Sequence, residues 1–470
     1  MSNDHEHDEL NEELTNDGKT AKEAEEEKEL SIIDNFKILF GASKAFWLVN
    51  QVNFFDGIAY FGILNLLTLF ISRDVGLSDQ WTGISVSWFT GGVTLFMFGG
   101  GFVADKLGVR RSLTLCLLGL LIGRTLLVGS PMFGGFATDV ALWSALLVMA
   151  LATGVLQPTI YAGVKEFTDP RTATIGYSLL YAIMNLGIVA STIVSPLIRE
   201  AAVGHDAAAK GGGISTMFTI YVGVTVFMLV LHLIGFTKKT EIRDRVVEVV
   251  SDKKEGEEEK TLGEKIRELP FLDARFLFFI FILLPVRTLF AHQFLTLPDY
   301  VIRCFPENVG ARYEWFQGLN PLIIVIFVPL IAALTRKVNI IKMMIIGTSI
   351  SALTTFILVP GPNLTTLILY VVIFSFGEAV WSSRFLEYVA NLAPAGKVGA
   401  YMGLAGIPWF LAKFTTGFYS GSMIAHFIPV DGPHDSGTMW LIYAFIALIS
   451  PVGLILGRKW VTKGVPQNAA

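Results

Sequence analysis

Charged residues are scarce in this chain. Asp, Glu, Lys and Arg together make up 16% of its 470 residues, whereas 53% of the residues are hydrophobic. A soluble domain cannot keep that much apolar surface away from water, so lipid must be the solvent for most of the chain. Soluble enzymes and nucleic-acid-binding proteins are therefore disfavoured, and an integral membrane protein is indicated.

Cysteine is nearly missing as well. Cys116 lies in an apolar run and Cys304 in a distant loop, with no CxxC or other ligand spacing. We therefore expect neither a disulfide nor a metal site, and no cofactor. A Walker A or other nucleotide-binding loop is also absent from the sequence, so ATP is not the expected energy source.

Residues 1–30 are nearly free of large apolar side chains. Residues 1–40 are rich in Asp and Glu and do not supply the basic and apolar regions of a signal peptide. Such a composition cannot bury enough surface to fold. We predict an acidic, disordered cytoplasmic tail.

What the chain does have is a series of long apolar runs. A bilayer core of roughly 30 Å requires about 20 apolar residues per helix. Runs of this kind lie at about 44–71, 81–104, 112–130, 139–163, 174–198, 214–236, 274–297, 315–334, 339–359, 364–388, 398–423 and 438–457. They predict an all-α membrane protein with about twelve spanning helices in two six-helix halves. The predicted halves are 41–236 and 271–458, joined by a charged cytoplasmic linker at 237–270 and followed by a cytoplasmic tail at 459–470.

The basic residues of the short loops are concentrated in alternate loops. Cytoplasmic loops carry an excess of Lys and Arg, so this distribution predicts that both termini are cytoplasmic. We expect a bacterial inner (plasma) membrane protein that is monomeric in the lipid bilayer.

A loop motif stands between the second and third predicted spans. The segment GFVADKLGVRR fits the pattern G-x-x-x-D-(R/K)-x-G-x-(R/K)-(R/K), which resembles the signature loop of the major facilitator superfamily and implies its fold. The glycines permit close helix approach, and the aspartate can pair with a basic residue across the halves and hold one face shut. The alternative is a simple positive-inside loop. The predicted gating residues are Gly101, Asp105, Lys106, Gly108, Arg110 and Arg111.

Four further segments resemble one branch of that superfamily, the proton-dependent oligopeptide transporters. They are TGVLQPTIYAGVKEFTDP, GYSLLYAIMNLG, WFQGLNPLIIVIFVPL, and GEAVWSSRFLEYVANLAP with the following YMGLAGIPWFLAK. The resemblance covers both halves and implies secondary active transport by alternating access.

The first predicted helix departs from this family. The family pattern E-x-x-E-R-F-x-Y-Y is replaced by NFFDGIAYF, in which Asn53 and Asp56 stand for the two glutamates and Gly57 for the arginine, while Tyr60 is kept. Gln157 likewise replaces the lysine of the fourth helix. The resemblance implies that the two missing cations hold a peptide carboxylate and that Glu378 holds its ammonium group. A zwitterionic dipeptide is therefore less secure as the solute than a cationic, amino-bearing or capped compound, unless another cation substitutes.

Three cations within apolar runs are candidates for that substitution: Arg124, Arg287 and Lys413. A charge at the centre of a spanning helix costs about 2.5–3.5 kcal/mol on insertion scales, so these positions need an explanation. Arg124 and Lys413 also fit structural roles, either in an ion pair or with the charge reaching toward the interface. Asp56 is the favoured coupling carboxylate, because it has lost its neighbouring arginine and should bind a proton readily. Glu378 is either the counter-ion of the solute or a partner of Arg287 or Lys413.

The complete set of predicted binding or coupling residues combines these positions with polar residues of the family-like segments. It consists of Asn53, Asp56, Tyr60, Gln157, Tyr181, Asn185, Arg287, Gln293, Asn320, Glu378 and Trp409. They predict a proton-coupled secondary transporter of a small peptide-like or amino-bearing solute. The alternatives are an exporter or flippase of an amphiphile, lipid or drug, and a transport-inactive sensor.

Overall fold

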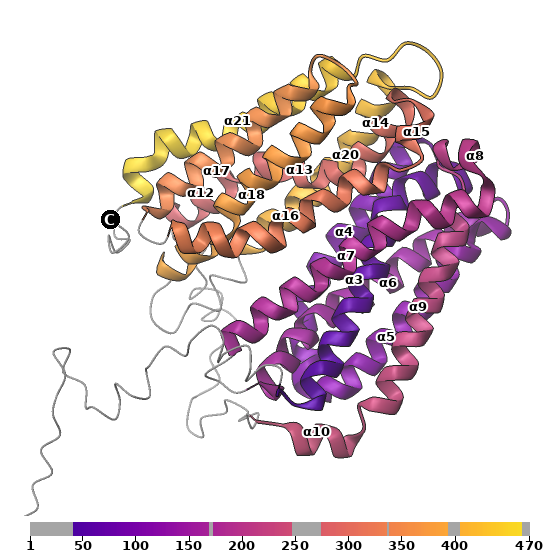
Figure 1. Ribbon diagram of the computed structural model, residues 1–470, viewed down its shortest axis with the longest axis vertical. Helices are drawn as coiled ribbons and strands as arrows, with labels where there is room; N and C mark the ends of the chain where they lie inside the picture. The colour runs from indigo at the N-terminus through magenta and orange to yellow at the C-terminus, as the bar shows by residue number, and fades with distance from the viewer. Residues whose placement is uncertain (1–40, 169–172, 247–273, 336–337, 393–404, 463–470) are drawn as a thin grey trace, which may run out of the picture.

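A computed structural model describes residues 41–168, 173–246, 274–335, 338–392 and 405–462. The predicted acidic tail at 1–40 and most of the predicted linker lie outside the described residues, as does the segment 463–470. The described ranges are helical, with short turns between the helices (Figure 1).

In the described residues, the first half and the start of the predicted linker contain six long α-helices and two short ones. The long helices are α3 (Lys44–Leu69), α4 (Asp79–Leu107), α5 (Val109–Gly129), α6 (Phe136–Phe167), α7 (Ala173–Val203) and α9 (Ile214–Gly235). The short helices are α8 (His205–Ala209) and α10 (Lys238–Asp244). The first two long helices begin at serine N-caps, where Ser43 accepts from the backbone N–H of Phe46 and Ser78 from that of Trp81.

The second half contains the remaining expected runs. Its helices are α12 (Ala274–Ile282), α13 (Leu284–Leu295), α14 (Leu297–Cys304), α15 (Glu307–Gly310), α16 (Tyr313–Leu334), α17 (Ile340–Thr354), α18 (Leu364–Leu392), α20 (Ile407–Phe427) and α21 (Ser436–Val461). The run expected at 274–297 is divided into α12 and α13, and α14 follows it directly. Pro285 and Pro298 stand at the starts of α13 and α14, where the missing N–H groups cost least.

Membrane-spanning character is clear for most of these elements. In the described ranges, nine helical segments are long and apolar enough to cross a bilayer. The other three expected runs form α4, α16 and α20, which lie within the same bundles (Figure 1).

The two halves meet at one end of the molecule. Figure 1 shows them converging near α8, α14 and α15 and diverging toward the end that carries α10. Small residues allow α4 and α20 to approach closely: a Cβ at Gly83 would lie 2.5 Å from the carbonyl oxygen of Gly417. Ser87 of α4 also donates to the carbonyl oxygens of Lys413 (2.9 Å) and Phe414 (2.8 Å) on α20.

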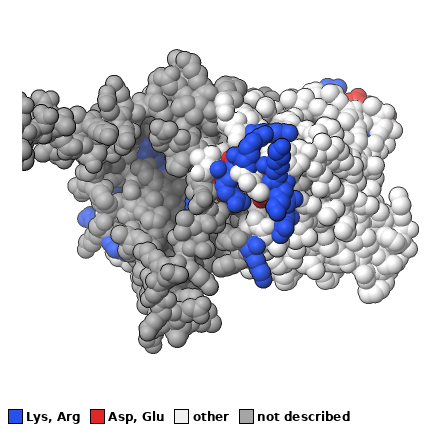
Figure 2. Space-filling view, turned by 90° about the horizontal axis from the view of Figure 1, so that it is seen from below, with Lys and Arg blue, Asp and Glu red and all other residues white. Residues whose placement is uncertain are grey.

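The start of the predicted linker is fastened to the first half through α10. Asp244 accepts from the backbone N–H of Ala45 at 2.9 Å, and Arg110 Nε lies 2.9 Å from Glu241 Oε2. The adjacent Arg243 guanidinium lowers the pKa of Asp244, so this carboxylate stays charged at the start of α3. Figure 2, which views the molecule from below, shows Lys and Arg side chains gathered on the described part of this end.

Candidate functional site: a cavity between the halves

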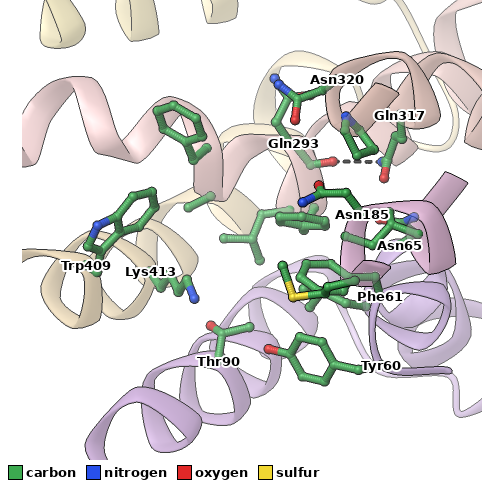
Figure 3. A pocket seen from close by; sticks show the side chains of 18 of the residues that line it. Tyr60, Phe61, Asn65, Thr90, Asn185, Gln293, Gln317, Asn320, Trp409 and Lys413 are labelled. Carbon is green, nitrogen blue, oxygen red and sulfur yellow. Dashed lines mark hydrogen bonds between the residues drawn. The ribbon is translucent and has the colours of Figure 1, made fainter. Parts of the chain in front are cut away.

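A cavity of about 270 Å³ lies between the two halves, near the lower limit for a small-molecule site. The first half contributes residues from α3, α4 and α7, and the second half contributes residues from α13, α16, α18 and α20 (Figure 3). Its polar lining consists of Tyr60, Asn65, Thr90, Tyr181, Asn185, Gln293, Gln317, Asn320, Glu378 and Lys413. The remainder is largely aromatic and aliphatic.

Most of the predicted binding residues meet in this cavity. Tyr60, Tyr181, Asn185, Gln293, Asn320, Glu378 and Trp409 all line it. Asn65, Thr90 and Gln317 also line it and were missed by the sequence analysis. A polar residue within an apolar run was their only sequence signal. Gln317 donates to the backbone oxygen of Gln293 at 2.8 Å, which links α16 to α13 (Figure 3).

Glu378 is the acidic residue of the cavity wall. Its Oε2 accepts a hydrogen bond from Asn320 Nδ2 at 2.8 Å, and the same amide donates to Ser375 Oγ at 3.0 Å. This contact joins α18 to the Asn-Pro segment of α16. None of the described Lys or Arg side chains forms an ion pair with Glu378, so a neutral amide alone orients the carboxylate.

Lys413 is the basic residue of the same wall. It lies one helical turn after Trp409 on α20, and its ammonium group is directed toward Thr90 (Figure 3). No carboxylate in the described ranges pairs with it. The structural interpretation of Lys413 as an ion-pair partner is therefore not supported by its surroundings.

Asp56 lies behind the cavity lining and not in it. Its Oδ1 lies 2.6 Å from Arg124 Nη2, and both side chains are buried. Arg124 Nη1 donates to Thr225 Oγ1 at 2.7 Å, so the pair connects α3, α5 and α9. The expectation that Asp56 lacks a cationic neighbour is thus wrong, because α5 supplies an arginine where α3 has lost one.

The other predicted residues outside the lining have different surroundings. Asn53 donates from Nδ2 to the backbone oxygen of Leu180 at 2.7 Å and ties α3 to α7. Gln157 is half-buried on α6, one residue before Pro158. Arg287 is buried on α13 against aromatic rings that include Trp409.

A buried ion pair seals the end where the halves converge. Arg199 of α7 contacts Glu314 of α16 through two bonds, Nε to Oε1 at 2.9 Å and Nη2 to Oε2 at 2.8 Å. Arg199 also donates to three backbone oxygens around it, those of Ala208, Gly212 and Ala311. The two-point geometry and complete burial make this a strong contact between the halves.

A second, part-buried ion pair joins the halves at the same end. Arg303 of α14 lies 2.7 Å from Asp79 of α4 and 2.8 Å from Asp299 of its own helix. The structure is therefore closed at this end by cross-half contacts that use Arg199 and Arg303.

Comparison with known proteins identifies the family of this chain. The family model described as Major Facilitator Superfamily matches residues 52–416, which is most of the chain. The chain belongs to the Major Facilitator Superfamily. It is a transporter and not an enzyme, and its fold is the major facilitator fold of peptide transporter structures.

Two distant curated relatives match most of this transporter's length. A "Dipeptide and tripeptide permease A" of Proteus mirabilis is 21% identical over 474 residues, covering 89% of this chain and 93% of the relative. An "Uncharacterized MFS-type transporter YqjV" of Bacillus subtilis is 19% identical, covering 85% of this chain and 93% of the relative.

Solved structures show the same fold. A crystal structure of the peptide transporter POT with alafosfalin superposes with a TM-score of 0.71 at 18% identity, covering 93% of this chain and 100% of that chain. A POT family transporter in complex with 5-aminolevulinic acid gives a TM-score of 0.66 at 16% identity, covering 90% of this chain and 98% of that chain.

The signature loop of this transporter is only partly described. Gly108 separates α4 from α5 with a φ of +79°, a backbone conformation that favours glycine. Arg110 pairs with Glu241 of α10, whereas Lys106 and Arg111 are exposed and Gly101 is half-buried. The side chain of Asp105 lies outside the described residues. The described ion pair of this loop thus reaches the linker helix, while the cross-half ion pairs lie at the opposite end.

We predict that Asp56→Asn destabilises the transporter by about 3–5 kcal/mol, because it leaves the Arg124 charge buried without a counter-ion. Thermal unfolding of purified protein measures this effect. The double variant Asp56→Leu, Arg124→Leu removes both charges and should recover most of the lost stability. A stable double variant that still loses proton-driven accumulation would return the coupling role to Asp56.

Proposed function

We propose that this protein is a proton-coupled transporter of a small amino-bearing, peptide-like solute. The observation that carries the proposal is Glu378, an acidic side chain in the cavity wall that no described cation neutralises. A carboxylate in such a place favours either a bound proton or a cationic group of the solute, since an uncompensated charge there is costly.

The relatives support the same solute class. Dipeptide and tripeptide permeases are similar to this chain across both halves, and the POT transporters that share its fold are described in complex with alafosfalin and 5-aminolevulinic acid. The aromatic and amide side chains of the cavity suit a short peptide-like backbone, because amides can donate to and accept from its N–H and C=O groups.

In the proposed transporter, the sealed end faces the outside of the cell. Positive charge on the loops predicts cytoplasmic termini, and the Arg199–Glu314 pair lies at the end opposite α10 (Figure 1). The described conformation then corresponds to a state closed to the outside. Opening that end must break the Arg199–Glu314 pair. One chain supplies both halves of the cavity, so the proposed transporter functions as a monomer.

Proteoliposomes test the proposal directly. A purified transporter should accumulate labelled alanylalanine when the outside is made acidic, and addition of unlabelled alanylalanine without an imposed gradient should carry protons inward with it. Uptake that never exceeds the outside concentration, at any pH gradient, would exclude proton coupling. Transport of a lipid or drug without transport of di- and tripeptides or amino acids would support the exporter interpretation.

A further inference from the structure

The first half of the cavity wall has lost its positive charge. Gly57 and Gln157 stand where the resemblance implies cations, and the Arg124 guanidinium is occupied by Asp56 at 2.6 Å. Among the described residues, Lys413 is the cation that lines the cavity, and it belongs to the second half.

A second cation stands directly behind this wall. Arg287 of α13 is 1% exposed, and none of its three guanidinium nitrogens has a hydrogen-bond partner among the described residues. Its guanidinium carbon lies 4.8 Å from the ring centre of Trp409 and 4.2 Å from that of Phe385. Cation–π contact with these rings offsets part of the desolvation cost but neutralises no charge. Trp409 separates this charge from the cavity and lies one turn from Lys413.

Lys413 and Arg287 pair with no carboxylate in the described part of the chain, and two such cations beside one wall make that wall attractive to an anion. A buried charge without a counter-ion costs several kcal/mol of stability. A function that requires the charge is a physical reason for its presence in this protein. Glu378, the carboxylate that would bind a solute ammonium group, lies on α18 of the same half.

We propose that Lys413 binds the carboxylate of the solute, with Arg287 behind Trp409 strengthening the positive potential of this subsite. The inference rests on the proposed function and specifies its substrate class: a compact zwitterion whose ammonium and carboxylate groups are both held by the second half. The first half then contributes neutral groups, such as Tyr60, Asn65 and Asn185, to the middle of the solute.

The test compares one solute with and without its charges. Binding of alanylalanine, its C-terminal amide and its N-acetyl form is measured by calorimetry on purified wild type, Lys413→Met, Lys413→Arg and Arg287→Met. For Lys413→Met we expect the Kd of alanylalanine to rise about 10- to 100-fold, which corresponds to a charge-assisted hydrogen bond. The Kd of the amide should change little, Lys413→Arg should keep the preference for the free acid, and Arg287→Met should weaken that preference less than Lys413→Met.

The controls separate this inference from the proposed function. Lys459→Met removes an exposed lysine at the end of α21 and should change no Kd. Neither Lys413→Met nor Arg287→Met removes a described ion-pair partner, so thermal stability should stay equal to or above wild type. Equal losses for acid and amide in Lys413→Met would overturn the inference and leave the proposed function standing. Failure of wild type to bind any of the three compounds would overturn both.

Discussion

Glu378→Gln is expected to abolish accumulation of the solute against its gradient. The substitution keeps the shape of the side chain and its contact with Asn320, but the amide binds neither a proton nor a solute ammonium by charge. In this variant no described carboxylate of the cavity remains to bind the proton that drives uptake. In proteoliposomes with an acidic exterior, the internal solute concentration should no longer exceed the external one.

A matched carboxylate provides the control for this result. Asp139 lies at the start of α6, away from the cavity lining, and Asp139→Asn removes one acidic group without touching the proposed site. This variant should accumulate solute like wild type. If Glu378→Gln retained full accumulation, the coupling group would lie elsewhere, and the Asp56–Arg124 pair would be the next to examine.

The fold could be read from the sequence because its elements are local. Apolar runs of sufficient length form helices in lipid, where each backbone group must be satisfied within its own segment. Part of the cavity lining followed from family-like segments, since Tyr181, Asn185, Asn320 and Glu378 all line it. These positions are identified by neighbours in the sequence, so no knowledge of helix packing was required.

The charge pairs could not be read in the same way. Asp56 and Arg124 are separated by 68 positions, and Arg199 and Glu314 by 115, so their contact depends on which helices touch. The sequence shows a lost arginine beside Asp56 but does not show that α5 replaces it. For the same reason the sequence does not show that Arg199 forms a buried contact between the halves.

We further expect Glu314→Gln to shift the transporter toward a state open at the sealed end. The Arg199–Glu314 contact joins α7 to α16, so it exists only while the halves are together at that end. Breaking one partner of a buried ion pair costs about 3–5 kcal/mol, and each 1.4 kcal/mol changes a two-state equilibrium about tenfold. A shift of this size would make the open state abundant.

Cysteine labelling at the cavity measures the shift. Phe61→Cys places a thiol in the cavity lining, and a membrane-impermeant reagent is applied from the side of the sealed end. Labelling should accelerate by tenfold or more in the Glu314→Gln background. Glu307→Gln, which alters an exposed pair with Lys210 at the same end, should leave the rate unchanged.

The exchanged pair Arg199→Glu, Glu314→Arg separates gating from simple destabilisation. Restored protection in the exchanged variant would show that attraction between the halves, and not the identity of either side chain, closes this end. The glutamate of Arg199→Glu cannot donate to the three backbone oxygens that Arg199 contacts. The protection from labelling should therefore be restored only in part. Unchanged labelling in Glu314→Gln together with a lower unfolding temperature would instead assign the pair to stability, and closure would then depend on Arg303 with Asp79 and on the close packing of α4 against α20.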